Sequence, residues 1–71
     1  MTRSESAAQS ELIRSWEEHC QIPSINHAAR ILGLSWVTYS RYRKGASPLP
    51  VAIQYAMHAI ARKMPPWGQV V

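Results

Sequence analysis

The chain lacks the side chains on which most hydrolytic and metal chemistry depends. It contains no aspartate, which excludes a Ser-His-Asp triad, and its four glutamates all lie before residue 19. The three histidines fall in three different predicted helices, and the adjacent pair His19 and Cys20 does not have the spacing of a zinc site. We therefore expect a protein that is not an enzyme and needs no metal or cofactor, and no small-molecule ligand is evident.

Cysteine and long apolar runs are also scarce. Cys20 is the single cysteine, which excludes an intrachain disulfide and fits a reducing, cytoplasmic setting. No apolar run is long enough to cross a membrane, and the polar start MTRSESAAQS is not a signal peptide. With 71 residues the chain makes one small domain near the lower size limit for a single core, where oligomerisation would add buried surface.

Acidic charge is missing from most of the chain, whereas basic charge is not. The formal net charge is +4, and the chain from His19 onward carries no acid. The basic residues of that part are Arg30, Arg41, Arg43, Lys44, Arg62 and Lys63. Such a surface attracts polyanions, although charge alone could equally serve solubility. The cluster from Arg41 to Lys44 favours nucleic acid; membrane-surface binding is disfavoured because no helix pairs a long basic face with a broad exposed apolar one.

Apolar periodicity predicts an all-α fold with four helices. They are expected at about residues 7–20, 25–32, 36–43 and 50–63. Ser6 and Gln9 have the spacing of a capping box, which puts the start of the first helix after a disordered segment 1–5. The core stripe of this helix consists of Leu12, Ile13, Trp16 and Cys20. The folded domain is expected over residues 6–64, followed by a tail at 65–71.

The two middle helices have the spacing of a helix-turn-helix. Ser24 and Ser35 can each cap the helix that follows, because a serine oxygen accepts an unpaired amide hydrogen of the first turn. Gly33 suits the positive φ of a tight corner between them. On the second helix Tyr39 and Tyr42 share the core face. The opposite face carries Trp36, Val37, Ser40 and Arg41, and we expect it to enter a DNA major groove.

The last predicted helix is apolar on two sides. Its core stripe is expected to hold Ile53, Ala56, Met57, Ile60 and Met64. A second stripe of Val51, Tyr55 and Ala59 lies on the far side and predicts a homodimer through this helix. The alternative is that Tyr55 only covers the edge of the core. The apolar tail 65–71, with Trp67, either folds back over the core or crosses to the partner subunit.

The sequence AARILGLSWVTYSRYRKG followed by SPLPVAIQYAMHAIA resembles the Cro and phage-repressor class of helix-turn-helix regulators. The matching marks are Ala29, Gly33, Leu34, Tyr39 and Tyr42, within a resemblance that covers roughly residues 22–63. The segment PVAIQYAMHAIA also resembles the final helix of small anti-CRISPR-associated regulators. That resemblance implies a dimer that binds promoter repeats and represses phage operons.

The chain departs from this class where bases are usually read. Members often have glutamine near the start of both motif helices, whereas this chain has Ile25-Asn26 and Trp36-Val37. We therefore expect Arg41 to contact guanine, Val37 a thymine methyl, and Ser40 a base edge or a phosphate. Trp36 either packs on a thymine methyl or the sugar backbone, or folds sideways onto the first helix. The expected phosphate contacts are Asn26, Arg30, Thr38, Arg43 and Lys44.

These expectations combine into a sequence-specific repressor of double-stranded DNA. A homodimer on an inverted repeat would place its half-sites roughly 34 Å apart, one helical turn of DNA. The alternative is a small phage-type interaction module, an inhibitor or adaptor that uses exposed Trp36 and Val37 to anchor another protein. A single-stranded nucleic-acid binder is disfavoured because Tyr39 and Tyr42 are needed in the core.

Overall fold

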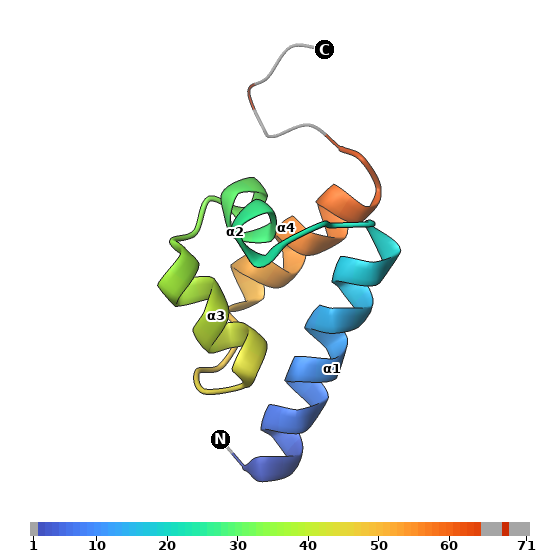
Figure 1. The fold of residues 1–71 in the computed structure, drawn as a ribbon. Coiled ribbons are helices and arrows are strands. Elements are labelled where there is room, and N and C mark those ends of the chain that lie inside the picture. The colour runs from blue at the N-terminus through green and yellow to red at the C-terminus, as the bar shows by residue number, and fades with distance from the viewer. Residues whose placement is uncertain (1, 65–67, 69–71) are drawn as a thin grey trace.

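The computed structural model of this protein describes residues 2–64 and 68, and within them it contains four helices and no strand (Figure 1). The helices are α1 (Arg3–His19), α2 (Ile25–Leu32), α3 (Trp36–Lys44) and α4 (Val51–Ala61). The prediction of an all-α fold with four helices is confirmed. The tail segments 65–67 and 69–71 lie outside the described residues, and so does the predicted dimer contact of Trp67.

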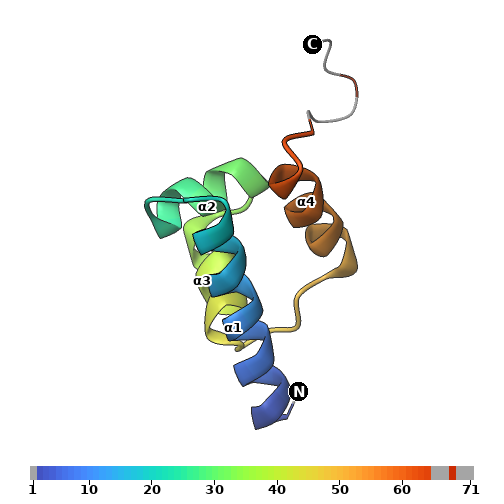
Figure 2. The same cartoon turned by 90° about the vertical axis from the view of Figure 1, so that its right-hand side faces the viewer.

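All four helices contribute to one core. The long helix α1 packs along α3, α2 packs against α3, and α4 contacts both α1 and α2 (Figures 1 and 2). The buried side chains are Ile13, Trp16, Ala28, Ala29, Tyr39 and Met57. Trp16 ties α1 to α4, since its indole Nε1 donates a hydrogen bond of 2.9 Å to the carbonyl oxygen of Met57. Within the described residues, no helix combines the length and the apolar character that crossing a bilayer requires.

The first helix begins earlier than its sequence indicated. Thr2 is the N-cap, and its hydroxyl accepts a hydrogen bond of 3.2 Å from the amide of Glu5. Residues 3–5 therefore form the first turn of α1 instead of a disordered segment, and the expected start near residue 7 is wrong. Ser6 and Gln9 have the spacing of a capping box, but in the fold both lie inside the helix and bind the distant end of α3 and the loop after it.

The other boundaries agree more closely with their sequence signals. The predicted range of α2 is confirmed, and α3 runs on to Lys44. α4 begins at Val51, with Pro50 as its N-cap residue, and ends at Ala61 rather than at residue 63.

Two residues assigned to core stripes are exposed. Leu12 is 55% exposed because it lies where α1 and α4 diverge, so it lines a surface groove instead of the core. Met64 is exposed because it lies beyond the end of α4. The remaining members of both stripes are buried or half-buried.

The N-terminal turns of α1 hold the loop that joins α3 to α4. Gln9 makes three hydrogen bonds to the end of α3 and to this loop, donating from Nε2 to the carbonyl oxygens of Tyr42 on α3 at 2.9 Å and Ser47 at 2.8 Å. Its Oε1 accepts from the amide of Leu49 at 2.9 Å. Ser6 donates to the carbonyl oxygen of Gly45 at 2.9 Å. The end of α3 is thus fixed by contacts with residues more than thirty positions away in the chain.

Gly45 and Gly33 offer a matched pair for testing this close approach. Both have positive φ, 75° and 72°, so an alanine at either position costs about 1–2 kcal/mol in backbone conformation. A Cβ at Gly45 would also lie 2.6 Å from the backbone oxygen of Ser6, whereas one at Gly33 would meet nothing within 4 Å.

Gly45→Ala is therefore expected to lower the free energy of unfolding, measured by urea denaturation, clearly more than Gly33→Ala does. Equal losses for the two variants would contradict the tight contact between α1 and the end of α3.

Candidate functional site

The corner between α2 and α3 is built from local capping contacts. The hydroxyl of Ser24 accepts from the amide of His27 at 3.1 Å, and that of Ser35 accepts from the amide of Thr38 at 3.1 Å. Both predicted N-caps are confirmed. Gly33 ends α2 in the left-handed conformation, with φ of 72°. The two helices are thus joined by residues 33–35 alone, which makes the corner short and well defined.

Small and aromatic side chains hold these two helices against the rest of the protein. Ala28 and Ala29 of α2 are buried, and their size lets neighbouring helices approach closely. Tyr39 of α3 is only 1% exposed, and Tyr42 is half-buried. The predicted core roles of these residues are confirmed. The buried side of α3 therefore determines which of its side chains remain outside.

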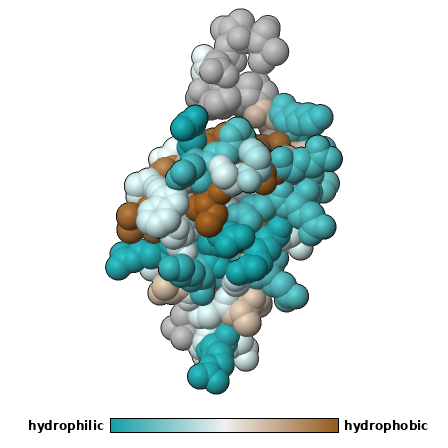
Figure 3. All heavy atoms as spheres, viewed as in Figure 1, coloured by the Kyte–Doolittle hydropathy of each residue, from teal (hydrophilic) through white to brown (hydrophobic). Residues whose placement is uncertain are grey.

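The side of α3 turned away from Tyr39 is exposed and carries no acid. At 100° per residue, Val37, Arg41 and Lys44 lie opposite Tyr39. We call the set Trp36, Val37, Ser40, Arg41 and Lys44 the α3 face. Arg41 and Lys44 are exposed, and Ser40 is half-buried. Figure 3 shows apolar and hydrophilic groups interleaved around the α2–α3 corner.

Large apolar side chains stand on this basic surface. Trp36 is 54% exposed and Val37 is 58% exposed, and neither belongs to the buried core. About half of the Trp36 side chain is thus open to solvent, and both alternatives given for it remain predictions. Exposed apolar groups on such a face are available to a partner, whether it is a base or another protein.

Arg43 differs from the other basic residues of α3 because it is paired within the protein. Its Nε donates to both carboxylate oxygens of Glu17 on α1, at 3.0 Å and 3.2 Å. The hydrogen bond that Arg43 donates to Glu17 outweighs the effect of burial and raises the pKa of the Arg43 guanidinium. The hydroxyl of Tyr39 donates to the same carboxylate. The charge of Arg43 is thus largely balanced by Glu17, so Arg41 and Lys44 are the stronger cationic candidates on α3.

Glu17 is the residue that sequence reasoning missed, because it is not a member of the apolar stripe predicted for the first helix. A signal was available, since Glu17 follows buried Ile13 by four residues and so lies on the same side of α1. Within the described residues no three His, Cys, Asp or Glu side chains are grouped to hold a metal.

The remaining predicted contacts lie on other surfaces. Asn26 and Arg30 are exposed one turn apart on α2. The hydroxyl of Thr38, half-buried on α3, accepts a hydrogen bond of 2.8 Å from Ser35. On α4, Val51 and Tyr55 are exposed and Ala59 is half-buried. Tyr55, at 73% exposure, does not cover the core edge, so the alternative given for it is contradicted.

The buried contact of Tyr39 with Glu17 makes the free energy of unfolding depend on pH in the alkaline range. Burial first, and then the hydrogen bond to Glu17, raises the pKa of the Tyr39 hydroxyl well above its usual value. In the unfolded chain this hydroxyl ionises near pH 10, so above that pH the unfolded state binds fewer protons than the folded one. The free energy of unfolding is therefore expected to fall as pH rises beyond about 10, by up to about 1.4 kcal/mol per pH unit.

Urea denaturation at several pH values, compared between wild type and Tyr39→Phe, measures this contribution. The variant is expected to be less stable at neutral pH and to lose less stability between neutral and alkaline pH. Tyr55→Phe is the control, because it removes an exposed hydroxyl and should keep the wild-type profile. An unchanged profile in Tyr39→Phe would contradict the assigned role.

No protein-family model matches this chain, and neither a curated protein nor a solved structure matches it. The candidate site is therefore defined from this chain alone. It consists of the α3 face together with Asn26 and Arg30 of α2.

Proposed function

We propose that this protein is a sequence-specific, double-stranded DNA-binding regulator of the helix-turn-helix kind that resembles the Cro and phage-repressor class. Helix α3 enters the major groove, and two copies bind an inverted repeat and repress by occluding the promoter. The observation that carries the proposal is the α3 face, where exposed Val37, Arg41 and Lys44 lie opposite buried Tyr39 and exposed Trp36 stands at the start of the helix. The cytoplasm is the compartment in which such a regulator acts.

The size and charge of α3 support this function. A helix with its side chains is about 10–12 Å across, which fits a major groove about 12 Å wide. The α3 face contains no acid, and the acids of the chain lie on α1. Of these, Glu17 is already paired with Arg43. A phosphate backbone approaching α3 therefore meets Arg41 and Lys44 without a facing carboxylate on the same helix.

Each residue of the site receives a role from its side chain and its exposure. Arg41 donates two hydrogen bonds to guanine, and Val37 contacts a thymine methyl. Ser40 reaches a base edge or phosphate, and exposed Trp36 packs against a thymine methyl or the sugar backbone. The phosphate contacts, which position the protein without reading sequence, are Asn26, Arg30, Thr38, Lys44 and the remaining donors of Arg43.

Binding-site selection from random duplex DNA, followed by the stoichiometry of the selected complex, tests the proposal. We expect an inverted repeat whose half-sites lie one helical turn apart, occupied by two chains. Selection that recovers no motif would overturn the assignment as a sequence-specific regulator.

The exposure of Trp36 and Val37 also supports a second candidate, a protein-interaction module that uses the same surface. Large apolar side chains in the centre of a surface are typical anchors in protein interfaces. The two candidates differ in their response to DNA. A regulator retains duplex DNA at moderate salt, whereas a module that binds protein alone releases it.

Arg41 and Lys44 are expected to affect DNA binding in different ways. Arg41→Ala should weaken binding to the selected site by about 1–3 kcal/mol and relax its sequence preference, because a bidentate contact to guanine is lost. Lys44→Ala should weaken selected and random duplexes equally and lower the slope of log affinity against log salt by about 0.9. Both effects are measured by fluorescence anisotropy across a salt series.

Each variant serves as the control for the other, because only Arg41→Ala is expected to change the preference for the selected sequence. Equal loss on selected and random DNA in Arg41→Ala would make Arg41 a phosphate contact. An unchanged salt slope in Lys44→Ala would remove Lys44 from the phosphate contacts.

A further inference from the structure

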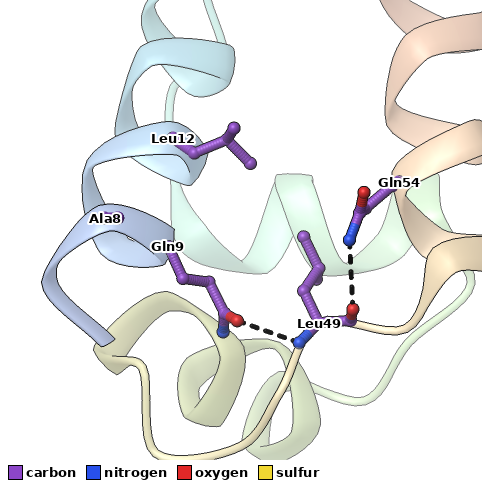
Figure 4. Close-up of a pocket in the computed structure, with 5 residues that line it drawn as sticks. All are labelled: Ala8, Gln9, Leu12, Leu49 and Gln54. Atoms are coloured by element: carbon purple, nitrogen blue, oxygen red, sulfur yellow. Dashed lines mark hydrogen bonds between the residues drawn. The ribbon is translucent and has the colours of Figure 1, made fainter. Parts of the chain in front are cut away.

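A groove on the surface runs between α1 and α4, away from the α3 face. It consists of two adjoining hollows of about 220 Å³ and about 260 Å³, which share Leu12 and Gln54. Figure 4 shows the first of the two. Its lining consists of Ala8, Gln9, Leu12, Trp16, Leu49, Gln54 and Met57. Figure 4 shows Leu12 and Gln54 on facing helices, with Leu49 between them. The lining is largely apolar and carries no charged side chain.

The exposed side chains of Val51 and Tyr55 on α4 form a ridge beside this groove. Val51 precedes the groove residue Gln54 by one helical turn, and Tyr55 follows it directly. Tyr55 is 73% exposed, and Val51 is exposed as well. From Val51 to Ala61, α4 contains no aspartate, glutamate, lysine or arginine. The ridge and the groove therefore form one continuous surface without a charged side chain.

The absence of charge makes this surface the face on which two copies of this chain can meet. Each copy carries a formal net charge of +4, so two copies repel each other over most orientations. An uncharged face lets them approach without bringing like charges together. A two-fold interface also requires one surface that is complementary to itself, and a ridge next to a groove meets that requirement.

The charges at the two ends of the surface are complementary as well. α1 and α4 run in the same direction, because Gln9 binds Leu49 just before α4 and Trp16 binds Met57 within it. Glu5 lies on the groove side of α1, seven residues before Leu12, and Arg62 follows Tyr55 by seven residues at the end of α4. Both are exposed. Two α4 helices crossing antiparallel would bring the Arg62 of each copy toward Glu5 of the other.

We propose that Tyr55 and Val51 of one protomer seat in the α1–α4 groove of a second copy, with Leu12 as the central contact and the α4 helices antiparallel. This assignment rests on the homodimer of the proposed function and gives that dimer an interface that includes α1. Two buried Tyr55 side chains supply roughly 300–500 Å² of buried surface, against roughly 1,200 Å² for the smallest stable interfaces. The remainder comes from Val51 and the groove lining, so the dimer dissociates on dilution.

Sedimentation equilibrium of the full chain without DNA, from micromolar to millimolar concentration, tests the interface. Wild type is expected to show a monomer–dimer equilibrium. Leu12→Lys and Tyr55→Lys should each raise the dimer Kd roughly tenfold or more, because each puts an ammonium group into the apolar contact. Ala7→Lys is the matched control, since it adds the same charge on the side of α1 turned away from the groove.

Because Leu12 and Tyr55 are exposed in the protomer, these variants should keep the wild-type circular dichroism spectrum and thermal midpoint to within a few degrees. A wild type that stays monomeric over the whole range would overturn the proposal. So would a dimer that Leu12→Lys leaves intact, or one that is lost when the chain is cut after Met64, since residues 65–71 would then hold it together.

Charge reversal tests the antiparallel arrangement. Glu5→Arg and Arg62→Glu should each weaken the dimer roughly two- to tenfold, and the double variant should recover most of the wild-type Kd. A double variant weaker than either single one would overturn this arrangement. These measurements contain no DNA, so they separate failure of the interface from failure of the DNA-binding proposal.

Discussion

The rotation of α3 about its own axis decides what this protein presents to a partner, and Tyr39 fixes that rotation. The ring of Tyr39 is buried in the core, and its hydroxyl is held by Glu17 of α1. Because side chains on a helix are separated by 100°, one side chain held inward points Val37 and Arg41 outward. The exposed α3 face is therefore a direct consequence of one buried contact between α1 and α3.

Glu17 links that buried contact to the charge of the surface. Its carboxylate accepts from Tyr39 and from Arg43, so it serves packing and electrostatics at once. By balancing Arg43, it leaves Arg41 and Lys44 as the cations of α3 that form no ion pair within the part of the chain that the structure describes. The chain has few acids, so the position of this one carboxylate strongly affects the electrostatic potential at the α3 face, where an anionic ligand would bind.

Polar contacts also decide how closely α1 and α4 approach. Gln9 and Trp16 tie α1 to the start and middle of the α4 region, and Leu12 lies between them along α1. The two helices meet through these hydrogen bonds, so Leu12 remains at the wall of a groove instead of in the core. A chain of 71 residues can bury only a small core. A second subunit on an apolar surface of this kind would bury additional apolar area.

The sequence by itself determined the features that depend on near neighbours. The caps at Ser24 and Ser35, the end of α2 at Gly33 and the inward faces of Tyr39 and Tyr42 follow from contacts or spacings of a few residues. Such signals are complete within one helical turn or one helix, so they can be read without the fold. Four helices and the division of α3 into a buried and an exposed side were predicted on this basis.

Only the tertiary structure decided the features that depend on distances between helices. Ser6 and Gln9 have the spacing of a local cap, yet they bind the end of α3 and the loop after it, more than thirty residues away. Leu12 has the right spacing for the core, but the divergence of α1 from α4 exposes it, and only the approach of α1 to α3 brings Glu17 to Arg43. Periodicity gives the direction of a side chain on its own helix; it does not give the position of the helix that the side chain meets.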